Sequence, residues 1–128
     1  MARKQVGAAP SDPSDGVTKL YVDTITPNTR PTNETAYTLA LTDLGKVVET
    51  TNTAANTVTI PPSSSVPFPQ NGTLEVLAYG TGQTTLVEGV GVTIRSVGSK
   101  KKLTGQFSSV ALRYRGANEW VATGDLST

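Results

Sequence analysis

Hydrophobic and polar residues alternate in short runs along most of the chain from Thr38 onward. The period of two residues, together with the abundance of Thr and Val, is typical of β-strands. Segments rich in Gly, Pro, Asn and Asp separate the runs, and these residues favour turns. The runs expected to form strands are 37–41, 46–50, 57–60, 73–79, 84–88, 92–95, 110–114 and 119–123.

The number and spacing of these runs predict an all-β domain over residues 38–128. The pattern favours an antiparallel β-sandwich, a jelly roll or a small barrel. Segments 80–83 and 89–91 each contain two glycines. We expect both to be hairpin turns, because neither continues into a phosphate-binding motif. Phe68 is expected to anchor an irregular crossover, and Tyr114 and Trp120 to fill the core.

Residues 1–37 differ from the rest of the chain because Pro, Asp, Asn and Thr are frequent in them. This composition favours an extended N-terminal arm that becomes ordered mainly on another surface. One short helix is expected at about 13–24, where a capping Asp is followed by Pro and where Val17, Leu20 and Tyr21 share one face. That face could pack on the chain's own domain, dock on a partner subunit, or stay disordered.

The composition argues against catalysis. The chain contains no His and no Cys, which removes the commonest general base near neutral pH, thiolate nucleophiles and Cys-ligated zinc. The acidic residues are scattered along the strands and turns, without the pairing that glycoside hydrolysis requires. We therefore expect no enzymatic activity, no metal ion and no cofactor.

The charge and hydropathy patterns limit the partners. A net charge of +1 creates no field that would select nucleic acid or an anionic membrane. The run Lys100–Lys102 is expected to be a solvated loop, with contact to an acidic subunit or a polyanion as the alternatives. Neither a secretion signal nor a membrane-spanning run is recognised. The hydrophobic content of 36% limits the core and favours a homo-oligomer.

Two sets of motifs resemble virion surface proteins of tailed phages, particularly those that infect actinobacteria. The segments VGAAP at 6–10 and DGVTKLYVD at 15–23 resemble the opening of tail fibres, minor tail proteins and head fibres or decoration proteins. The segments LGKVVE at 44–49, VTIP at 58–61 and WVATGDL at 120–126 resemble a small β-domain at the ends of such proteins. Together the two sets span most of the chain.

The resemblance implies a virion structural component, usually trimeric, that is attached by its arm and projects its β-domain outward. Because the chain has no room for a fibre shaft, we expect a capsid decoration protein, similar to a head fibre, on the surface of a virion made in the host bacterial cytoplasm. Its partner would be the major capsid protein. The residues expected to dock are Val17, Leu20 and Tyr21 as apolar contacts, and Arg3, Lys4 and Lys19 as partners of acidic positions.

The alternative is a minor tail or tail-fibre protein that contributes to recognition of host-surface glycans and has tail proteins as its partners. In that case the exposed loops of the β-domain would carry the recognition. A non-viral adhesin or a carbohydrate-binding module is the remaining interpretation.

Overall fold

The computed structural model describes residues 29–128, so the helix expected at 13–24 lies outside the described residues. The strands are β2 (Thr29–Thr32), β3 (Ala36–Thr38), β4 (Val47–Thr50), β5 (Asn56–Ile60), β6 (Thr73–Ala78), β7 (Thr84–Glu88), β8 (Thr93–Arg95), β9 (Lys102–Leu103), β10 (Ser109–Gly116), β11 (Glu119–Gly124) and β12 (Leu126–Ser127). Two short 3₁₀ helices, η1 (Leu41–Asp43) and η2 (Val97–Ser99), lie between strands. The all-β prediction is confirmed. In this part of the chain no helix has the length and apolarity needed to cross a membrane.

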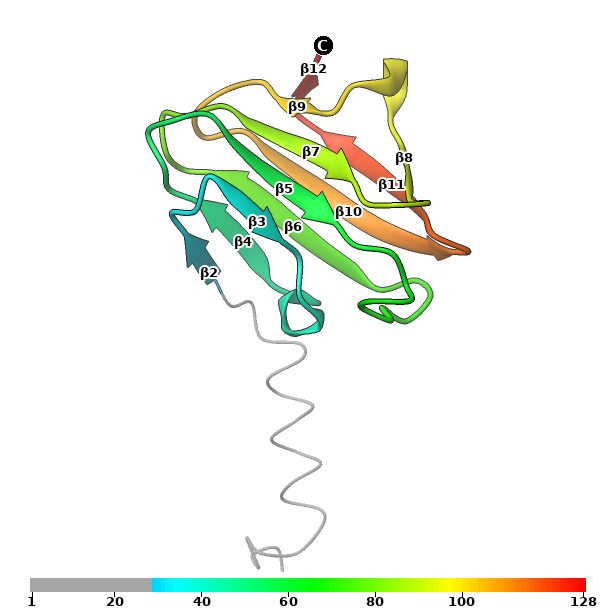
Figure 1. Cartoon of the computed structure of the whole chain (residues 1–128). Coiled ribbons are helices and arrows are strands. Elements are labelled where there is room, and N and C mark those ends of the chain that lie inside the picture. The colour runs from blue at the N-terminus through cyan, green and yellow to red at the C-terminus, as the bar shows by residue number, and fades with distance from the viewer. Residues whose placement is uncertain (1–28) are drawn as a thin grey trace, which may run out of the picture.

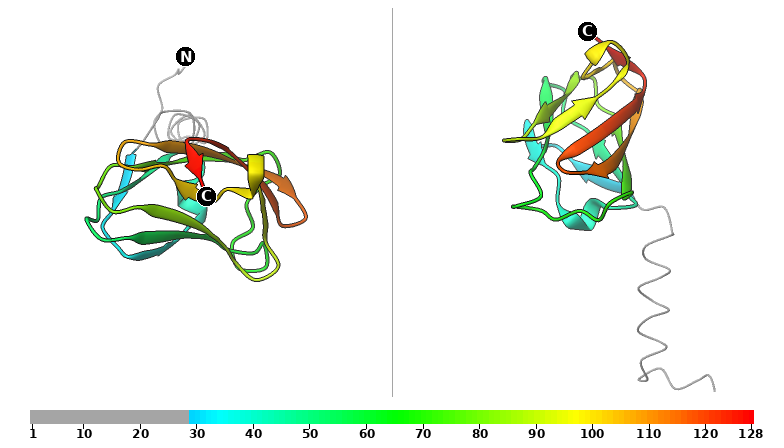
Figure 2. Two further views of the ribbon diagram at one scale, coloured as in Figure 1. Left: turned by 90° about the horizontal axis from the view of Figure 1, so that it is seen from above. Right: turned by 90° about the vertical axis from the view of Figure 1, so that its right-hand side faces the viewer.

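The strands form two sheets that pack face to face (Figure 1; Figure 2). The six-stranded sheet has the order β2-β4-β6-β10-β11-β8, and the five-stranded sheet has the order β12-β9-β7-β5-β3. From β2 to β7 the chain alternates between the sheets, so each strand pairs with the strand two positions along the chain. These pairs are parallel, and the first half of the domain therefore winds as a flattened helix.

Both sheets are mixed, which differs from the antiparallel arrangement that the sequence favours. The antiparallel pairs involve β10 with β6 and β11, and β9 with β7 and β12. The hairpins predicted at 80–83 and 89–91 are wrong, because each segment carries the chain from one sheet to the other. A hairpin does join β10 to β11, and its turn residues Ala117 and Asn118 have φ of 53° and 59°. Two positive φ values in succession match the turn that suits a twisted hairpin.

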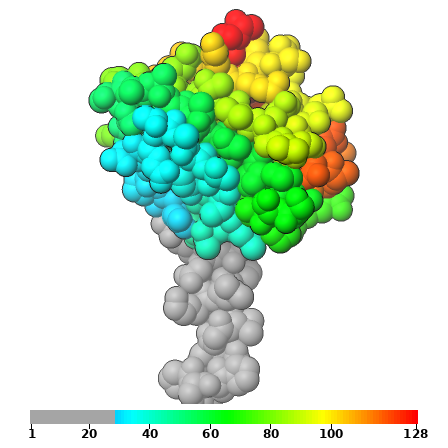
Figure 3. Space-filling view, viewed as in Figure 1, coloured from blue at the N-terminus to red at the C-terminus, as the bar shows by residue number. Residues whose placement is uncertain are grey.

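Two segments that the sequence places wholly or largely in the arm form strands of the two sheets, namely Thr29–Thr32 and Ala36–Thr38. Strand β2 pairs with β4, and β3 pairs with β5. Figure 3 shows the segment of β3 (cyan) beside that of β5 (green) on the surface. Pro31 does not prevent strand formation at this edge. The N–H of Thr51 donates to the Thr32 carbonyl (2.9 Å), so Thr32 faces β4 and Pro31 faces the outer edge of the sheet, where no N–H is needed.

One hydrophobic core fills the space between the sheets, built from alternate residues of the strands. Trp120 is 1% exposed and lies against Tyr114 and Phe68, with ring centroids 5.0 Å and 5.2 Å away. The expectations that Phe68 anchors the crossover and that Tyr114 and Trp120 fill the core are therefore confirmed. The strand expected over 37–41 ends at Thr38, and the chain then turns into η1, so Leu39 is buried whereas Leu41 is 46% exposed.

The parallel winding gives the domain two distinct poles (Figure 1). The pole where β2 begins at Thr29 is called the proximal pole, and it also holds segments 39–46, 61–72 and 89–92. The opposite end is called the distal pole, and it holds the arches 33–35, 51–55 and 79–83 that follow β2, β4 and β6. Because β10 runs antiparallel to β6, the loop 104–108 before β10 also lies at the distal pole.

Candidate functional site

The six residues expected to dock on a shell lie outside the described residues, so their roles stay predictions. They are Arg3, Lys4, Val17, Lys19, Leu20 and Tyr21. Two groups of side chains within residues 29–128 have chemistry that an ordinary core or solvated surface does not require. One is a buried carboxylate at the proximal pole, and the other is an exposed aromatic pair at the distal pole.

The buried carboxylate belongs to Asp43, the last residue of η1, whose side chain is fully buried. The Tyr37 hydroxyl donates to Asp43 Oδ2 (2.6 Å), and the Ala40 N–H donates to the same oxygen (2.9 Å). Asp43 Oδ1 accepts no hydrogen bond and lies 3.7 Å from Arg30 Nε. The carboxylate thus connects β2, β3 and η1 at the point where the chain enters the domain.

Burial raises the pKa of Tyr37 to about 12, with the hydrogen bond to Asp43 and the negative charge of Asp43 adding to the effect. The Tyr37 hydroxyl therefore stays protonated at neutral pH. It donates a hydrogen bond to Asp43 and cannot act as a base. Arg30 is 40% exposed, so water screens its attraction to the carboxylate. Tyr37, Asp43 and Arg30 are best explained as a structural cluster that holds β2 and β3 against η1. We call this cluster the lock.

The aromatic pair consists of Tyr79, which follows β6, and Phe107, which precedes β10. The two rings are T-shaped, with centroids 5.7 Å apart and an interplanar angle of 68°. Tyr79 is 54% exposed and Phe107 is 65% exposed. An edge-to-face contact leaves other ring faces open to solvent, so this pair offers apolar surface to a ligand.

The backbone around the pair is fixed by hydrogen bonds. The N–H of Phe107 donates to the Ala78 carbonyl (2.6 Å), and the Gln106 side-chain amide donates to the Tyr79 carbonyl (3.1 Å). Phe107 has a φ of 69°, a conformation that bulky residues rarely adopt. Such strained residues persist where the surrounding structure holds them, and they concentrate at functional sites.

Glycines allow the distal arches to stack closely beside this pair. The Gly80 N–H donates to the carbonyl of Thr50 at the end of β4 (2.8 Å), and the Gly82 N–H donates to the carbonyl of Asn52 in the arch that follows (3.0 Å). A Cβ on Gly82 would lie 1.9 Å from the Ala54 carbonyl oxygen. These glycines are therefore needed because two backbones approach each other closely at this point. They belong neither to a phosphate-binding motif nor to a hairpin.

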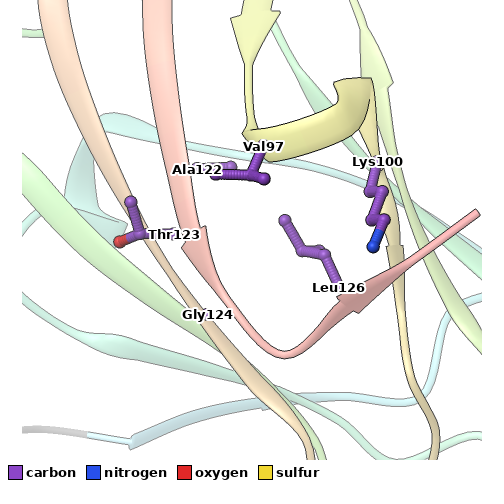
Figure 4. A pocket seen from close by; sticks show the side chains of 6 residues that line it. All are labelled: Val97, Lys100, Ala122, Thr123, Gly124 and Leu126. Atoms are coloured by element: carbon purple, nitrogen blue, oxygen red, sulfur yellow. The ribbon is translucent and has the colours of Figure 1, made fainter.

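The other candidate features give weaker grounds for a site. Lys102 is exposed, and Lys101 Nζ lies 3.9 Å from Glu88 Oε2, so the lysine run forms no isolated basic patch. A pocket of about 240 Å³ is lined by one cationic side chain, that of Lys100, which Figure 4 shows with the other lining residues. Its lining residues are Val97, Lys100, Ala122, Thr123, Gly124 and Leu126. Residues 29–128 contain no group of three or more acidic side chains that could hold a metal ion.

Sequence reasoning missed both groups, although a signal for the aromatic pair was present. Leu74, Val76 and Ala78 share the inward frame of β6, so Tyr79 falls in the outward frame. Phe107 likewise falls outside the inward frame of β10. Two aromatic residues in outward frames of paired strands indicate a surface cluster. The left-handed backbone of Phe107 has no counterpart in the sequence pattern.

No protein-family model matches the chain, and no curated protein matches it either. The arm motifs and the geometry of the described domain are therefore the grounds on which a function can be inferred.

Proposed function

We propose that this protein is a structural component of a tailed-phage virion, namely a capsid decoration protein similar to a head fibre. Its arm binds the major capsid lattice, and its β-domain projects outward as part of a homotrimer. One observation carries the proposal beyond the sequence motifs. Thr29 begins an edge strand at the proximal pole, so the junction with residues 1–28 is at one end of the domain and the distal pole is left for other contacts.

The proposed mechanism is attachment at several points. Val17, Leu20 and Tyr21 supply apolar contacts, while Arg3, Lys4 and Lys19 pair with acidic positions on the shell. Three linked arms raise the overall affinity by a factor on the order of 10² to 10⁴ over one arm. Because the arms bind only the assembled lattice, they shift the equilibrium toward the assembled shell and stabilise it.

Deleting residues 2–23 tests the arm as the anchor. The shortened chain should keep its β-sheet circular dichroism and should no longer co-sediment with purified particles. In the full-length chain, replacing Val17, Leu20 and Tyr21 together by Ser should have the same effect. The matched control is Asp15→Asn with Val22→Ser, on the opposite face of the expected helix, which should still co-sediment. Co-sedimentation of the deleted chain would move the anchor into the β-domain.

The second candidate is a minor tail or tail-fibre protein that contributes to recognition of host-surface glycans. The exposed aromatic pair Tyr79 and Phe107 favours this function, because it lies at the pole away from Thr29. The two candidates differ in where the protein lies on the particle. Electron microscopy should find it on the capsid in the first case and on the tail in the second.

A further inference from the structure

Phe107 is the third residue of the turn 105–108, which is closed by the hydrogen bond from the Ser108 N–H to the Gly105 carbonyl (3.2 Å), and this position favours Gly or Asn over Phe. Its φ of 69° is unfavourable for a bulky side chain, and 65% of the residue is exposed to solvent. Burial of the ring in the core therefore cannot be what offsets the strain. The hydrogen bond from the Phe107 N–H to the Ala78 carbonyl nevertheless fixes the backbone, and the ring lies against Tyr79. A strained, exposed and fixed aromatic ring is typical of a ligand site.

The two rings together form an apolar platform with a polar end. The T-shaped contact leaves the outer faces of Tyr79 and Phe107 accessible, and the Tyr79 hydroxyl adds a hydrogen-bonding group. The face of an aromatic ring carries a partial negative charge, which attracts the C–H groups of a ligand. A sugar ring is such a ligand, because one of its faces is lined with C–H groups and its rim with hydroxyls.

The surroundings of the platform are polar and almost free of charge. Segments 50–56, 79–85 and 104–110 build this part of the distal pole, and their polar residues are Thr, Asn, Gln, Ser and Tyr. These three segments contain no Asp, Glu, Lys or Arg. Hydroxyl and amide groups suit the hydroxyls of a neutral sugar, and segments without Lys or Arg give an anionic ligand no cationic partner.

We infer that Tyr79 and Phe107 form a stacking site for a neutral glycan at the distal pole. A sugar ring lies on the open aromatic faces, and the exposed side chain of Thr81, in the same arch as Tyr79, hydrogen-bonds its hydroxyls. This site does not depend on attachment to a virion, because all of its groups belong to the described domain.

The test is glycan binding by the full chain, measured by saturation-transfer NMR. The probes are neutral oligosaccharides of glucose, galactose, mannose and arabinose at concentrations up to about 10 mM, a range that detects weak single sites. An anionic hyaluronan tetrasaccharide serves as the comparison. At least one neutral probe should bind, with saturation transfer from aromatic protons of the protein, and the anionic probe should not.

Variants separate a binding role from a structural one. Phe107→Gly removes the ring and relieves the unfavourable φ, so it should weaken binding by about tenfold or more without lowering the melting temperature. Tyr79→Phe keeps the stacking face and should retain binding, whereas Tyr79→Ala should lose it. Val90→Ala, at an exposed residue of the proximal pole, is the matched control and should change nothing.

Four results would overturn the inference. They are the absence of binding to every neutral probe, binding that Phe107→Gly leaves intact, a preference for the anionic probe, and a self-associated wild-type chain that Phe107→Gly converts to a smaller species. The last result would assign the aromatic pair to contact between copies of this chain. None of the four bears on the arm, so failure here and failure of the capsid attachment are distinguishable.

Discussion

A single carboxylate, that of Asp43, holds together segments from the first two strands of the described domain and the turn that follows them. Its Oδ2 accepts from the Tyr37 hydroxyl and the Ala40 N–H, and Oδ1 lies near Arg30. The lock therefore depends on residues that come directly after the arm. Any change at this carboxylate should loosen β2 and β3 before it affects the strands of the second half.

Replacing Asp43 by Ala should lower the free energy of unfolding by about 2–4 kcal/mol, because the Tyr37 hydroxyl and the Ala40 N–H lose their acceptor in a buried site. The contribution of Arg30 is small, because Arg30 is 40% exposed. Asp43→Asn keeps an acceptor oxygen and should cost less. Urea denaturation measures the free energy of unfolding of both variants. The control is Asp125→Ala, at an exposed residue, which should change that free energy by less than about 0.5 kcal/mol. Equal losses at Asp43 and Asp125 would exclude the lock.

Because of Tyr37, the stability of the domain should fall at alkaline pH. Its pKa is about 12 in the folded protein, against about 10 in an unfolded chain, because the neutral phenol is favoured by burial and by Asp43. The folded state thus binds the proton more tightly. The stability from this group is complete below about pH 10 and is lost as pH rises toward about 12. Denaturation midpoints should fall over this range, and Tyr37→Phe should remove that part of the fall. An unchanged slope in the variant would contradict the assignment.

At the scale of elements, the stacking of the distal arches fixes how the parallel strands follow one another. Gly82 is required there, since a Cβ would lie 1.9 Å from the Ala54 carbonyl oxygen. Gly82→Ala should destabilise the domain by about 1–3 kcal/mol or more, because one backbone must move. Gly105→Ala is the matched control, with no atom within 4 Å of the added methyl group, and should be neutral or raise stability by up to about 1 kcal/mol. Thermal unfolding compares them, and similar melting temperatures would show that the arches can separate without cost.

The positions of the strands could be read from the sequence, whereas their pairing could not. The alternation around Val58 and Ile60, or around Leu74 and Val76, reports which residues face the core, and β5 and β6 lie where it predicts them. Alternation is a local property, and it is the same in parallel and antiparallel strands. The glycines at 80 and 82 were therefore read as a hairpin, although they serve a crossing between sheets.

The site was less predictable than the fold for a related reason. The left-handed φ of Phe107 depends on hydrogen bonds to β6, about 30 residues earlier in the chain. The burial of Asp43 likewise depends on Arg30, which the composition of residues 1–37 placed in the arm, and on Tyr37, which stood at the border of the arm and the first expected strand. Contacts between different elements of the fold decide both features, and no periodicity records them.

At the scale of the whole molecule, the domain has one pole at Thr29 and the opposite pole at the aromatic pair. Strand β6 has six residues, which corresponds to a length of roughly 20 Å, so the two poles are well separated. A protein attached through residues before Thr29 would turn its proximal pole toward the particle. Its distal pole would then meet the surrounding medium.

Single cysteines at the two poles can test this orientation, because the chain contains no Cys of its own. Thr81→Cys lies in a distal arch, and Val90→Cys lies in the proximal segment 89–92; both positions are exposed in the described domain. On purified particles, maleimide labelling at position 81 should be as fast as in the free protein, whereas labelling at position 90 should be slower, because the shell restricts access. In the free protein both should react alike. Slower labelling at position 81 than at position 90 would reverse the orientation and would make the aromatic pair part of the attachment.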